Sequence, residues 1–466
     1  MERKLIKFFD SKAKFRDKWI KRNKYYNNEI INFMKFHIPK DSRVLEIGCS
    51  TGHLLNALSP NGVGIDFSKE MIRIAQKKYP HLKFIKADAA NYQLKEKFDY
   101  IILSDTIGYF EDIQVVFKNI RQNCTNNTRI IINSFNYLWE PLFRFMEFIG
   151  LKMKQPFSSW LSSQDIRNLL KLEDFDIIKS GEKVLFPKYI PLISGIFNRF
   201  LANLPLIRKL CLVQYIIARP INIEPKTEKS VSIVIAARNE EGNIEKIIKT
   251  LPSLGKKNEI IFIEGGSSDN TWNEIIRVAG KYKKKDIKYA KQDGTGKGDA
   301  VRKGFEMASS DILMIYDADM TVPANDLIKF YEAIASNKGE FINGSRLVYP
   351  MEKQAMRTLN LFGNKMFGLL FSWMLNQKLK DTLCGTKVIS KKNYDILKKN
   401  RKYFGDFDPF GDFDLIFGAS KMDLKIAEIP IRYKERTYGD TNIRRFAHGL
   451  LLIKMCLFAM RKIKFV

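Results

Sequence analysis

The chain has 466 residues, a length that allows two or three domains with full-sized hydrophobic cores. Hydrophobic residues make up 45% and charged residues 28% of it, which excludes an intrinsically disordered protein. The formal net charge of +28 indicates an anionic partner, which is a nucleic acid, a nucleotide or an acidic membrane surface.

Three further features limit where the protein works. The five cysteines are odd in number and far apart, as is typical of free thiols in a reducing compartment. The first 25 residues carry too much charge for a signal peptide, and residues 1 to 40 are predicted to form an amphipathic helical lead-in. No uninterrupted apolar run reaches the roughly 18 residues that span a bilayer.

A glycine-punctuated turn follows the first predicted strand, residues 43 to 47. Gly48, Ser50 and Gly52 lie in this turn, immediately before a predicted helix. Glycines at such a place let the backbone approach a ligand and free amide groups at the helix N-terminus. A second strand ends in Asp66, where a carboxylate is placed to accept both hydroxyls of a ribose.

Two more short apolar segments continue this pattern. One ends in Asp88 and Ala89, and the next, residues 98 to 105, ends beside Thr106. Predicted helices lie between the strands, so this half of the chain is predicted to form an alternating, parallel α/β sheet.

These motifs resemble the class I S-adenosylmethionine-dependent methyltransferases, over about residues 25 to 185. The resemblance implies a Rossmann-like fold with S-adenosylmethionine as cofactor, and residues 104 to 108 along the methyl-transfer face. Ser50 stands where that family often has glycine. The residues that would bind the cofactor are Glu46, Gly48, Ser50, Gly52, Asp66, Asp88 and Ala89.

Residues 186 to 220 are rich in Leu, Ile and Phe but are interrupted by basic residues and by Pro191 and Pro205. Two interpretations stay open: the segment lies on a membrane surface without crossing it, or it is an amphipathic pair packed inside the protein. The polar, proline-containing residues 222 to 229 form the best candidate for a domain boundary.

The second half repeats the arrangement of buried strands that end in polar residues. One strand begins at Val231 and runs into Glu240, and the next runs into Glu264 and Asp269. Because open α/β sheets bind ligands at the carboxyl ends of their strands, these acids are predicted to line a site. A basic loop with Gly296 and Gly298 follows.

The apolar run within residues 310 to 321 ends in two carboxylates, Asp317 and Asp319. If the tip is extended, both side chains point the same way, which suits Mg²⁺ or Mn²⁺ held against a diphosphate. The same pattern also occurs as a solvated turn, but the preceding strand ends favour a metal site.

This order resembles the family-2 glycosyltransferases of GT-A type, most closely the dolichyl- or polyprenyl-phosphate sugar transferases, over about residues 230 to 445. The loop from Glu264 to Thr271 is longer than that family's usual Asp-Asp-Gly-Ser. The resemblance implies a nucleotide-sugar donor and an acceptor that is a polyprenyl phosphate or a glycan. The donor-binding residues would be Glu240, Glu264, Asp269, Gly296, Gly298, Asp317 and Arg436. Asp317 and Asp319 would be the metal ligands, and Asp319 and Asp412 the catalytic residues. Arg346 and Arg357 would bind the acceptor phosphate.

Asp412 has two interpretations. As a base it would remove the proton of a hydroxyl acceptor, whereas a phosphate acceptor is already ionised and needs no base. The alternative is a structural helix cap or charge partner. The tail from Phe446 to Val466 likewise stays open between a basic apolar helix on the inner leaflet of the membrane and a helix that packs on its own domain.

We therefore predict an α/β protein with a Rossmann-like methyltransferase sheet, a GT-A sheet and peripheral amphipathic helices. Its expected parts are a methyltransferase-like domain (residues 1–185), a connector (186–229), a glycosyltransferase domain (230–445) and a C-terminal helix (446–466). The expected function combines metal-dependent inverting glycosyl transfer with methylation. Its expected location is cytoplasmic and peripheral at the inner face of the cell membrane, in cell-envelope assembly.

Two alternatives from different classes stay open. In one, the first domain only binds S-adenosylmethionine or acts as a scaffold. In the other, the chain is a nucleic-acid methyltransferase, which we disfavour because the basic residues do not cluster with stacking aromatics, so no nucleic-acid partner is expected.

Overall fold

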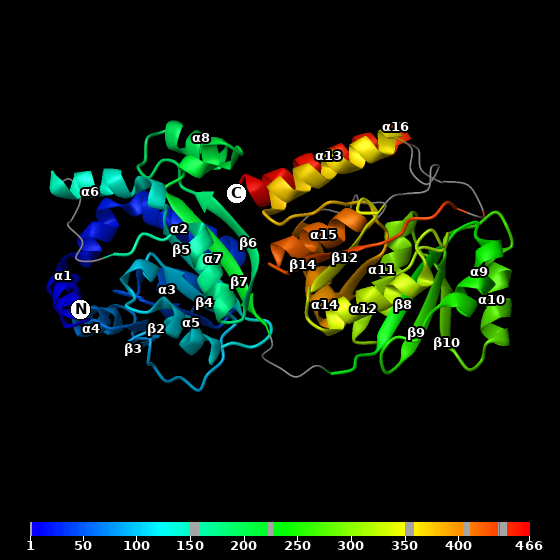
Figure 1. The fold of residues 1–466 in the computed structure, drawn as a ribbon, viewed down its shortest axis with the longest axis horizontal. Helices are drawn as coiled ribbons and strands as arrows, with labels where there is room; N and C mark the ends of the chain where they lie inside the picture. The colour runs from blue at the N-terminus through cyan, green and yellow to red at the C-terminus, as the bar shows by residue number, and fades with distance from the viewer. Residues whose placement is uncertain are drawn as a thin grey trace. The chain divides into compact units, whose positions relative to one another are not determined.

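The computed structural model describes residues 2–149, 158–221, 227–349, 358–403, 411–436, 438 and 445–466. The chain divides into two compact units. The first comprises residues 1–225 with 465–466, and the second comprises residues 226–464. In Figure 1 the first unit runs from blue to green along the chain and the second from green to red.

Each unit is built on a mixed seven-stranded sheet. In the first unit the strand order is β3-β2-β1-β4-β5-β7-β6, and β7 is antiparallel to both of its neighbours. The remaining pairs are parallel, as the sequence predicts. The strands are β1 Val44–Ile47, β2 Val63–Asp66, β3 Lys83–Lys86, β4 Tyr100–Ser104, β5 Arg129–Phe135, β6 Phe175–Lys183 and β7 Val213–Pro220.

Helices cover both faces of this sheet. Alternate side chains of the strands point to opposite faces, so each face buries its own apolar set. One face packs against α2, α3 and α4, and the other against α5 and α7. The helices of the unit are α1 Glu2–Arg22, α2 Lys24–His37, α3 His53–Leu58, α4 Lys69–Lys78, α5 Ile113–Arg121, α6 Glu140–Phe148, α7 Ser163–Leu172 and α8 Ile193–Arg199, with short 3₁₀ turns η1 Ile107–Tyr109, η2 Tyr137–Trp139, η3 Leu201–Asn203 and η4 Ile207–Leu210.

The second sheet has the order β10-β9-β8-β11-β13-β12-β14. Strand β13 is antiparallel to β11 and β12, and the other pairs are parallel. The strands are β8 Val231–Ala237, β9 Asn258–Glu264, β10 Asp286–Lys291, β11 Ile312–Ile315, β12 Phe341–Ser345, β13 Lys387–Ser390 and β14 Ile426–Pro430.

Two apolar layers enclose this second sheet. Helices α9, α10 and α12 pack on one face, and α11 and α13 to α16 on the other. Figure 1 shows α13 and α16 side by side, and Lys464 donates from Nζ to the carbonyl of Trp373 over 2.8 Å. The helices are α9 Glu241–Thr250, α10 Thr271–Lys281, α11 Lys297–Met307, α12 Leu327–Ala335, α13 Thr358–Leu375, α14 Lys391–Lys399, α15 Asp412–Lys421 and α16 Arg445–Ala459, with short turns η5 Ala324–Asp326, η6 Arg401–Tyr403 and η7 Met460–Lys464.

The segment predicted as a connector, residues 186–229, differs from that expectation over part of its length. Its residues 213–220 form β7, which is buried and lies between β5 and β6. Local pattern did not reveal this strand, because its partner β5 lies some 80 residues away along the chain and its partner β6 at least 30. Over the described ranges, no helix is long and apolar enough to cross a membrane.

Candidate active sites

The predicted donor residues follow strands that end together at one edge of the second sheet. Ala237 at the end of β8 lies opposite Glu264 at the end of β9, and β11 runs parallel on the other side of β8. Gly265 donates its backbone N–H to the carbonyl of Ala237 over 2.9 Å. The parallel register therefore gathers the acidic loops at a single edge, as predicted.

Arg436 connects two of these loops. It donates from Nη2 to Oδ2 of Asp319 over 2.9 Å and from Nη1 to Oε1 of Glu240 over 3.2 Å. Asn243 donates to the other Glu240 oxygen over 2.7 Å. Burial raises the pKa of Glu240 to about 7, although Asn243 and Arg436 both oppose this effect. One guanidinium thus holds together Glu240, predicted to bind the donor, and Asp319, predicted to bind the metal.

Asp317 and Asp319 do not lie on an extended tip. Strand β11 ends at Ile315, and a turn follows in which Met320 donates its N–H to the carbonyl of Asp317. Thr321 caps Asp319 through its N–H and its hydroxyl, at 3.2 and 2.9 Å. The expectation of an extended tip is therefore wrong, because the side chain of Thr321 stabilises a turn.

Lys297, between Gly296 and Gly298, is the partner of Asp317. Its Nζ lies 2.5 Å from Oδ1 of Asp317. Burial opposes ionisation of Asp317, but the charge and hydrogen bond of Lys297 outweigh it, so the pKa of Asp317 lies below its ordinary value. The acids raise the pKa of Lys297 against the effect of its burial, so this ammonium stays charged.

Gly385 lies against this pair. A Cβ atom at that position would come within 2.1 Å of Oδ2 of Asp317 and 2.4 Å of Nζ of Lys297. Any larger residue would therefore displace the ion pair. Gly411, the residue before α15, approaches Gly298 in the same way, with 2.9 Å from its would-be Cβ to the Gly298 Cα. Glycines allow α15 and the basic loop to meet closely.

Asp412 is the first residue of α15 and is buried. Its Oδ1 accepts a hydrogen bond from Nζ of Lys387 over 2.8 Å, and Lys387 is almost fully buried at the start of β13. The structure therefore gives Asp412 a charge partner, which was one of the two interpretations of the sequence.

Arg346 is also engaged within the unit. It donates from Nε and Nη2 to both oxygens of Asp381, over 2.8 and 2.9 Å, and Asn364 donates to the same carboxylate over 2.9 Å. Burial opposes ionisation of Asp381, but Arg346 lowers its pKa to about 2. The fork of Arg346 therefore points at Asp381, and Arg357 lies outside the described residues.

Asp269 and Glu264 bind backbone amides of their own loop. Asp269 accepts from the N–H of Thr271 over 3.0 Å at the start of α10, and Glu264 accepts from the N–H of Ser267 over 2.5 Å. Both acids thus shape the loop that was predicted to contact the nucleotide.

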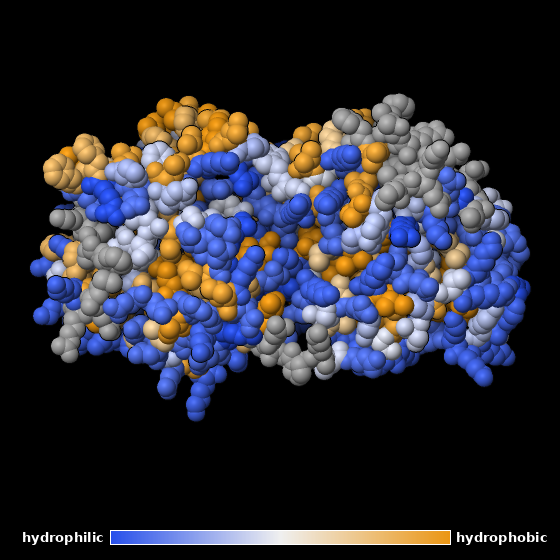
Figure 2. All heavy atoms as spheres, in the orientation of Figure 1, coloured by the Kyte–Doolittle hydropathy of each residue, from blue (hydrophilic) through white to orange (hydrophobic). Residues whose placement is uncertain are grey.

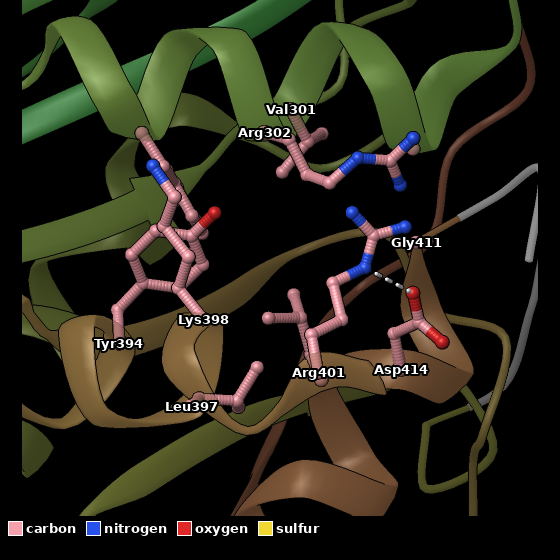
Figure 3. A pocket seen from close by; sticks show the side chains of 11 residues that line it. Val301, Arg302, Tyr394, Leu397, Lys398, Arg401, Gly411 and Asp414 are labelled. Carbon is pink, nitrogen blue, oxygen red and sulfur yellow. Dashed lines mark hydrogen bonds and ion pairs between the residues drawn. The ribbon is translucent and has the colours of Figure 1, made fainter. Parts of the chain in front are cut away.

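A cavity of about 20 Å³ lies behind the basic loop, between α11, α14 and α15 (Figure 3). Arg302 and Arg401 point toward one another across it, and Arg401 donates to Asp414 over 3.3 Å. Gly298 and Gly411 form part of its wall. This volume admits about one water molecule, so it is packing behind the site and no sugar pocket.

In the first unit, the predicted glycine turn joins β1 to α3. Gly48 and Gly52 have φ of 77° and 75°, which favour glycine, and Ser50 also has a positive φ of 51°. A Cβ at Gly48 would come within 2.3 Å of Cγ2 of Thr106. The turn therefore lies directly against the end of β4.

Asp66 at the end of β2 is bound to this turn. Its Oδ2 accepts from the N–H of Ser50 over 2.9 Å, and its Oδ1 accepts from the N–H of Ser68 over 2.8 Å. Burial raises the pKa of Asp66 to about 6 despite these two hydrogen bonds. Asp88, at the end of β3, accepts from the N–H of Ala90, and Ala89 is buried beside it.

Glu46 lies inside β1 and is buried. Burial raises the pKa of its carboxyl group to about 8. Its Oε2 is enclosed and has no hydrogen-bond partner among the described residues. A buried, unpaired carboxyl oxygen beside a glycine turn fits the predicted contact with the S-adenosylmethionine cofactor.

Helix α1 contacts the same loops, which the sequence did not predict. Asp17 accepts from the hydroxyl of Thr51 over 2.9 Å, Asp10 accepts from the hydroxyl of Ser68 over 2.5 Å, and Arg16 donates to the hydroxyl of Ser50 over 3.1 Å. These acids stand on the polar face of a helix that the sequence showed only as amphipathic.

Asp105 and Tyr26 form a second unpredicted pair. Tyr26 donates its hydroxyl to Oδ2 of Asp105 over 2.7 Å, and Asn133 donates to Oδ1 over 3.0 Å. Burial raises the pKa of Asp105 to about 6. Asp105 has a φ of 55°, and the sequence pointed only to its position at the end of a strand.

Comparison with known proteins supports both domains. Residues 232–397 match the family model described as glycosyl transferase family 2, and residues 19–180 match one described as a methyltransferase domain. These matches confirm both resemblances stated from the sequence. The chain therefore combines a methyltransferase domain with a glycosyltransferase family 2 domain.

Three curated relatives match part of this chain. Glycosyltransferase AglD of Haloferax volcanii is 27% identical over 46% of this chain and 34% of its own length. Dolichol-phosphate mannosyltransferase of Pyrococcus furiosus is 33% identical over 25% of this chain and 33% of its own length. UDP-N-acetylglucosamine–dolichyl-phosphate N-acetylglucosaminyltransferase of Methanococcus voltae is 26% identical over 49% of this chain and 97% of its own length. The match thus spans only about a third of the first and second of these three relatives.

Among solved structures, a SAM-dependent methyltransferase of Thermotoga maritima, described as a possible histamine N-methyltransferase, is 18% identical. It covers 46% of this chain and 99% of its own, with a TM-score of 0.37.

Proposed function

We propose that the second unit transfers a sugar from a nucleotide-sugar donor to a polyprenyl phosphate, with inversion at the anomeric carbon. In this reaction an acceptor oxygen bonds to the anomeric carbon while the bond to the donor diphosphate breaks, and its electrons leave with the nucleoside diphosphate. The observation that carries the proposal is the constellation of Asp317, Asp319 and Glu240 with Lys297 and Arg436 at the carboxyl edge of the sheet.

A divalent cation is part of this proposal. Asp317 and Asp319 would hold Mg²⁺ or Mn²⁺, which would supply positive charge against the departing diphosphate. Two carboxylates suit Mg²⁺, because it usually takes its other ligands from water and substrate phosphates. The described ranges contain no group of three or more His, Cys, Asp or Glu residues placed for a metal.

The surroundings of Asp412 favour a phosphate acceptor over a sugar hydroxyl. A general base must reach the acceptor hydroxyl with a free carboxylate oxygen. Asp412 is buried, and its Oδ1 already accepts a hydrogen bond from Lys387 over 2.8 Å. A polyprenyl phosphate needs no base, so the pair does not hinder that acceptor. The printed names of two relatives, which include dolichol or dolichyl phosphate, agree with this class.

For the first unit we propose S-adenosylmethionine binding at the turn from Gly48 to Gly52 and at Asp66, followed by methyl transfer. Two active sites on one chain raise the effective concentration of one product at the other site. The second candidate, a binding or scaffolding module, is favoured by one observation: Asp10, Arg16 and Asp17 of α1 bind the loops of the cofactor site.

We also propose a peripheral location at the cytoplasmic face of the cell membrane. Helix α16 buries Leu452 and Met455 in the core of its unit but exposes Leu450, Ile453 and Leu457. Both interpretations of the tail thus find support in one helix, with one face packed and one apolar face exposed.

The test is incubation of the whole chain with a panel of nucleotide sugars and a short polyprenyl phosphate in detergent, with and without a chelator. We expect release of nucleoside diphosphate and a glycosylated lipid phosphate, both dependent on metal. Transfer to a glycan hydroxyl alone would contradict the assigned acceptor. Binding of S-adenosylmethionine without methyl transfer to any lipid or glycan product would favour a binding or scaffolding module as the role of the first unit.

A further inference from the structure

An exposed apolar surface lies at one end of the first unit. It consists of residues 137–149, which form η2 and α6, and residues 189–210, which run from α8 to η4. We call it the apolar end surface. Phe148 is 87% exposed, Leu192 85% and Leu206 82%. Helices α6 and α8 lie where Figure 2 shows orange areas at the upper left. Contiguous apolar area of this kind marks an interaction site, since soluble surfaces seldom carry it.

Hydrogen bonds join the two segments at one end. Trp139 donates from its indole nitrogen to the carbonyl of Leu210 over 3.1 Å. Asn136 donates from its side chain to the carbonyls of Lys209 and Cys211, each over 3.0 Å, and from its backbone to Leu212 over 2.8 Å. The start of α6 is therefore fixed against the end of η4, although some 70 residues separate them in the chain.

The charge on and beside this surface is mostly positive, except on α6, which carries Glu140 and Glu147. Residues 184–210 contain Lys188, Arg199, Arg208 and Lys209 and no acidic residue. Arg208 pairs with Glu182 over 2.9 Å, while Lys188, Arg199 and Lys209 are exposed. Helix α6 adds apolar area without positive charge, because Arg144 pairs with Glu140 and Glu147 is acidic.

This surface begins beside the proposed methyl-transfer site. Phe135, the last residue of β5, lies with its ring 5.9 Å from Tyr26 and 5.3 Å from Phe143 of α6. Tyr26 in turn donates to Asp105 over 2.7 Å. Whatever covers the apolar end surface therefore also lies close to the carboxyl edge of the first sheet.

We propose that the first unit docks on an anionic lipid bilayer through the apolar end surface. Exposed Leu and Phe side chains enter the headgroup region, and the neighbouring lysines and arginines meet the negative lipid headgroups. Charge complementarity selects this partner, because residues 184–210 contain four basic residues and no acidic residue. The inference rests on the peripheral location proposed above and assigns a surface of the first unit to it, and it holds whichever reaction either unit catalyses.

Vesicle flotation of the full chain tests the proposal. One set of vesicles contains phosphatidylcholine alone, and the other contains phosphatidylcholine with phosphatidylglycerol. We expect binding to the anionic set at low salt and weaker binding at high salt. The double variant Leu192→Asp with Leu206→Asp should bind at least about tenfold more weakly, because it removes two large apolar contacts.

Leu172→Asp is the matched control. Leu172 is also exposed, at 65%, but it lies away from the apolar end surface. It is closely followed by Phe175, which pairs with Pro220 at the end of β7, whereas residues 189–210 precede Val213 at the start of β7. The control should bind like the wild type. A second variant, Leu450→Asp with Leu457→Asp on α16, separates this surface from the membrane contact proposed for the second unit.

Two results would overturn the docking surface. One is equal flotation of the wild type and the Leu192→Asp, Leu206→Asp variant on anionic vesicles. The other is a concentration-dependent dimer in sedimentation that this variant dissociates, with vesicle binding unchanged, because the surface would then hold a second copy. The circular dichroism spectrum and the thermal unfolding temperature of each variant should match those of the wild type, which shows that the variants fold and keeps this test independent of the glycosyl transfer.

Discussion

Lys387 donates a hydrogen bond from Nζ to Oδ1 of Asp412 over 2.8 Å, and both side chains are buried. The two residues belong to different elements, β13 and α15, which meet beside Asp317 and Lys297. This pair gives Asp412 the role of charge partner, which the sequence left open as one of two interpretations. It also supplies the sharpest test of the acceptor.

Replacing Asp412 with Asn should lower stability far more than it lowers transfer to a phosphate acceptor. The change leaves the buried Lys387 ammonium without its counter-charge, which typically costs about 3 kcal/mol of unfolding free energy. Urea denaturation measures the stability, and nucleoside diphosphate release with polyprenyl phosphate measures the transfer.

The double variant Asp412→Asn with Lys387→Met serves as the control, because it removes both charges and should recover much of the lost stability. If the double variant is stable but transfers no sugar to polyprenyl phosphate, Asp412 takes part in the chemistry, and its charge pair with Lys387 does not by itself explain its role.

The change Asp319→Asn should reduce sugar transfer by about a hundredfold, since loss of one electrostatic contact to a departing group is often worth about 3 kcal/mol. Metal affinity should fall as well. Titration of Mn²⁺ and the release of nucleoside diphosphate are the measurements. Asp311→Asn, at the opposite end of β11, is the matched control. Full activity of Asp319→Asn in the presence of a chelator would contradict metal-dependent transfer.

Replacing Asp66 with Ala should abolish binding of S-adenosylmethionine and leave sugar transfer unchanged, because the two sites lie in separate units. Asp66 fixes the turn through the N–H of Ser50 and would bind the ribose. Titration calorimetry measures the affinity. Asp99→Ala, which changes a carboxylate bound to the N–H of Arg43 at the start of β1, is the control. Unchanged affinity in Asp66→Ala would remove the assigned cofactor site.

The stability of the first unit should fall as the pH rises from 4.5 to 8. Burial raises the pKa of Glu46 from 4.5 to about 8, so the folded chain binds this proton more tightly than the unfolded chain. Between those two values the folded form loses that advantage, at up to about 1.4 kcal/mol per pH unit.

The variant Glu46→Gln lacks this titration and keeps the side-chain volume. Its unfolding free energy should therefore exceed that of the wild type by a growing margin as the pH approaches 8. Urea denaturation followed at several pH values in this range checks the difference. A constant difference between Glu46→Gln and the wild type would show that Glu46 is ionised in the folded protein.

The sequence alone determined the two-domain organisation and the order of the main strands. Buried strands that end in glycines or acids are local signals, so residues 43–66 and 231–240 could be interpreted without a structure. The same signals placed Glu240, Asp317 and Asp319 at one edge, because parallel strands end on the same side of a sheet.

Tertiary structure alone decided the partners of these residues. Arg436 lies 196 residues from Glu240 in the chain, and Tyr26 lies 79 residues from Asp105. No local periodicity connects such pairs, because they form only when separate loops meet across a folded sheet. For the same reason the strand β7, hidden in a segment that resembled a connector, was visible only once its partners β5 and β6 were in place.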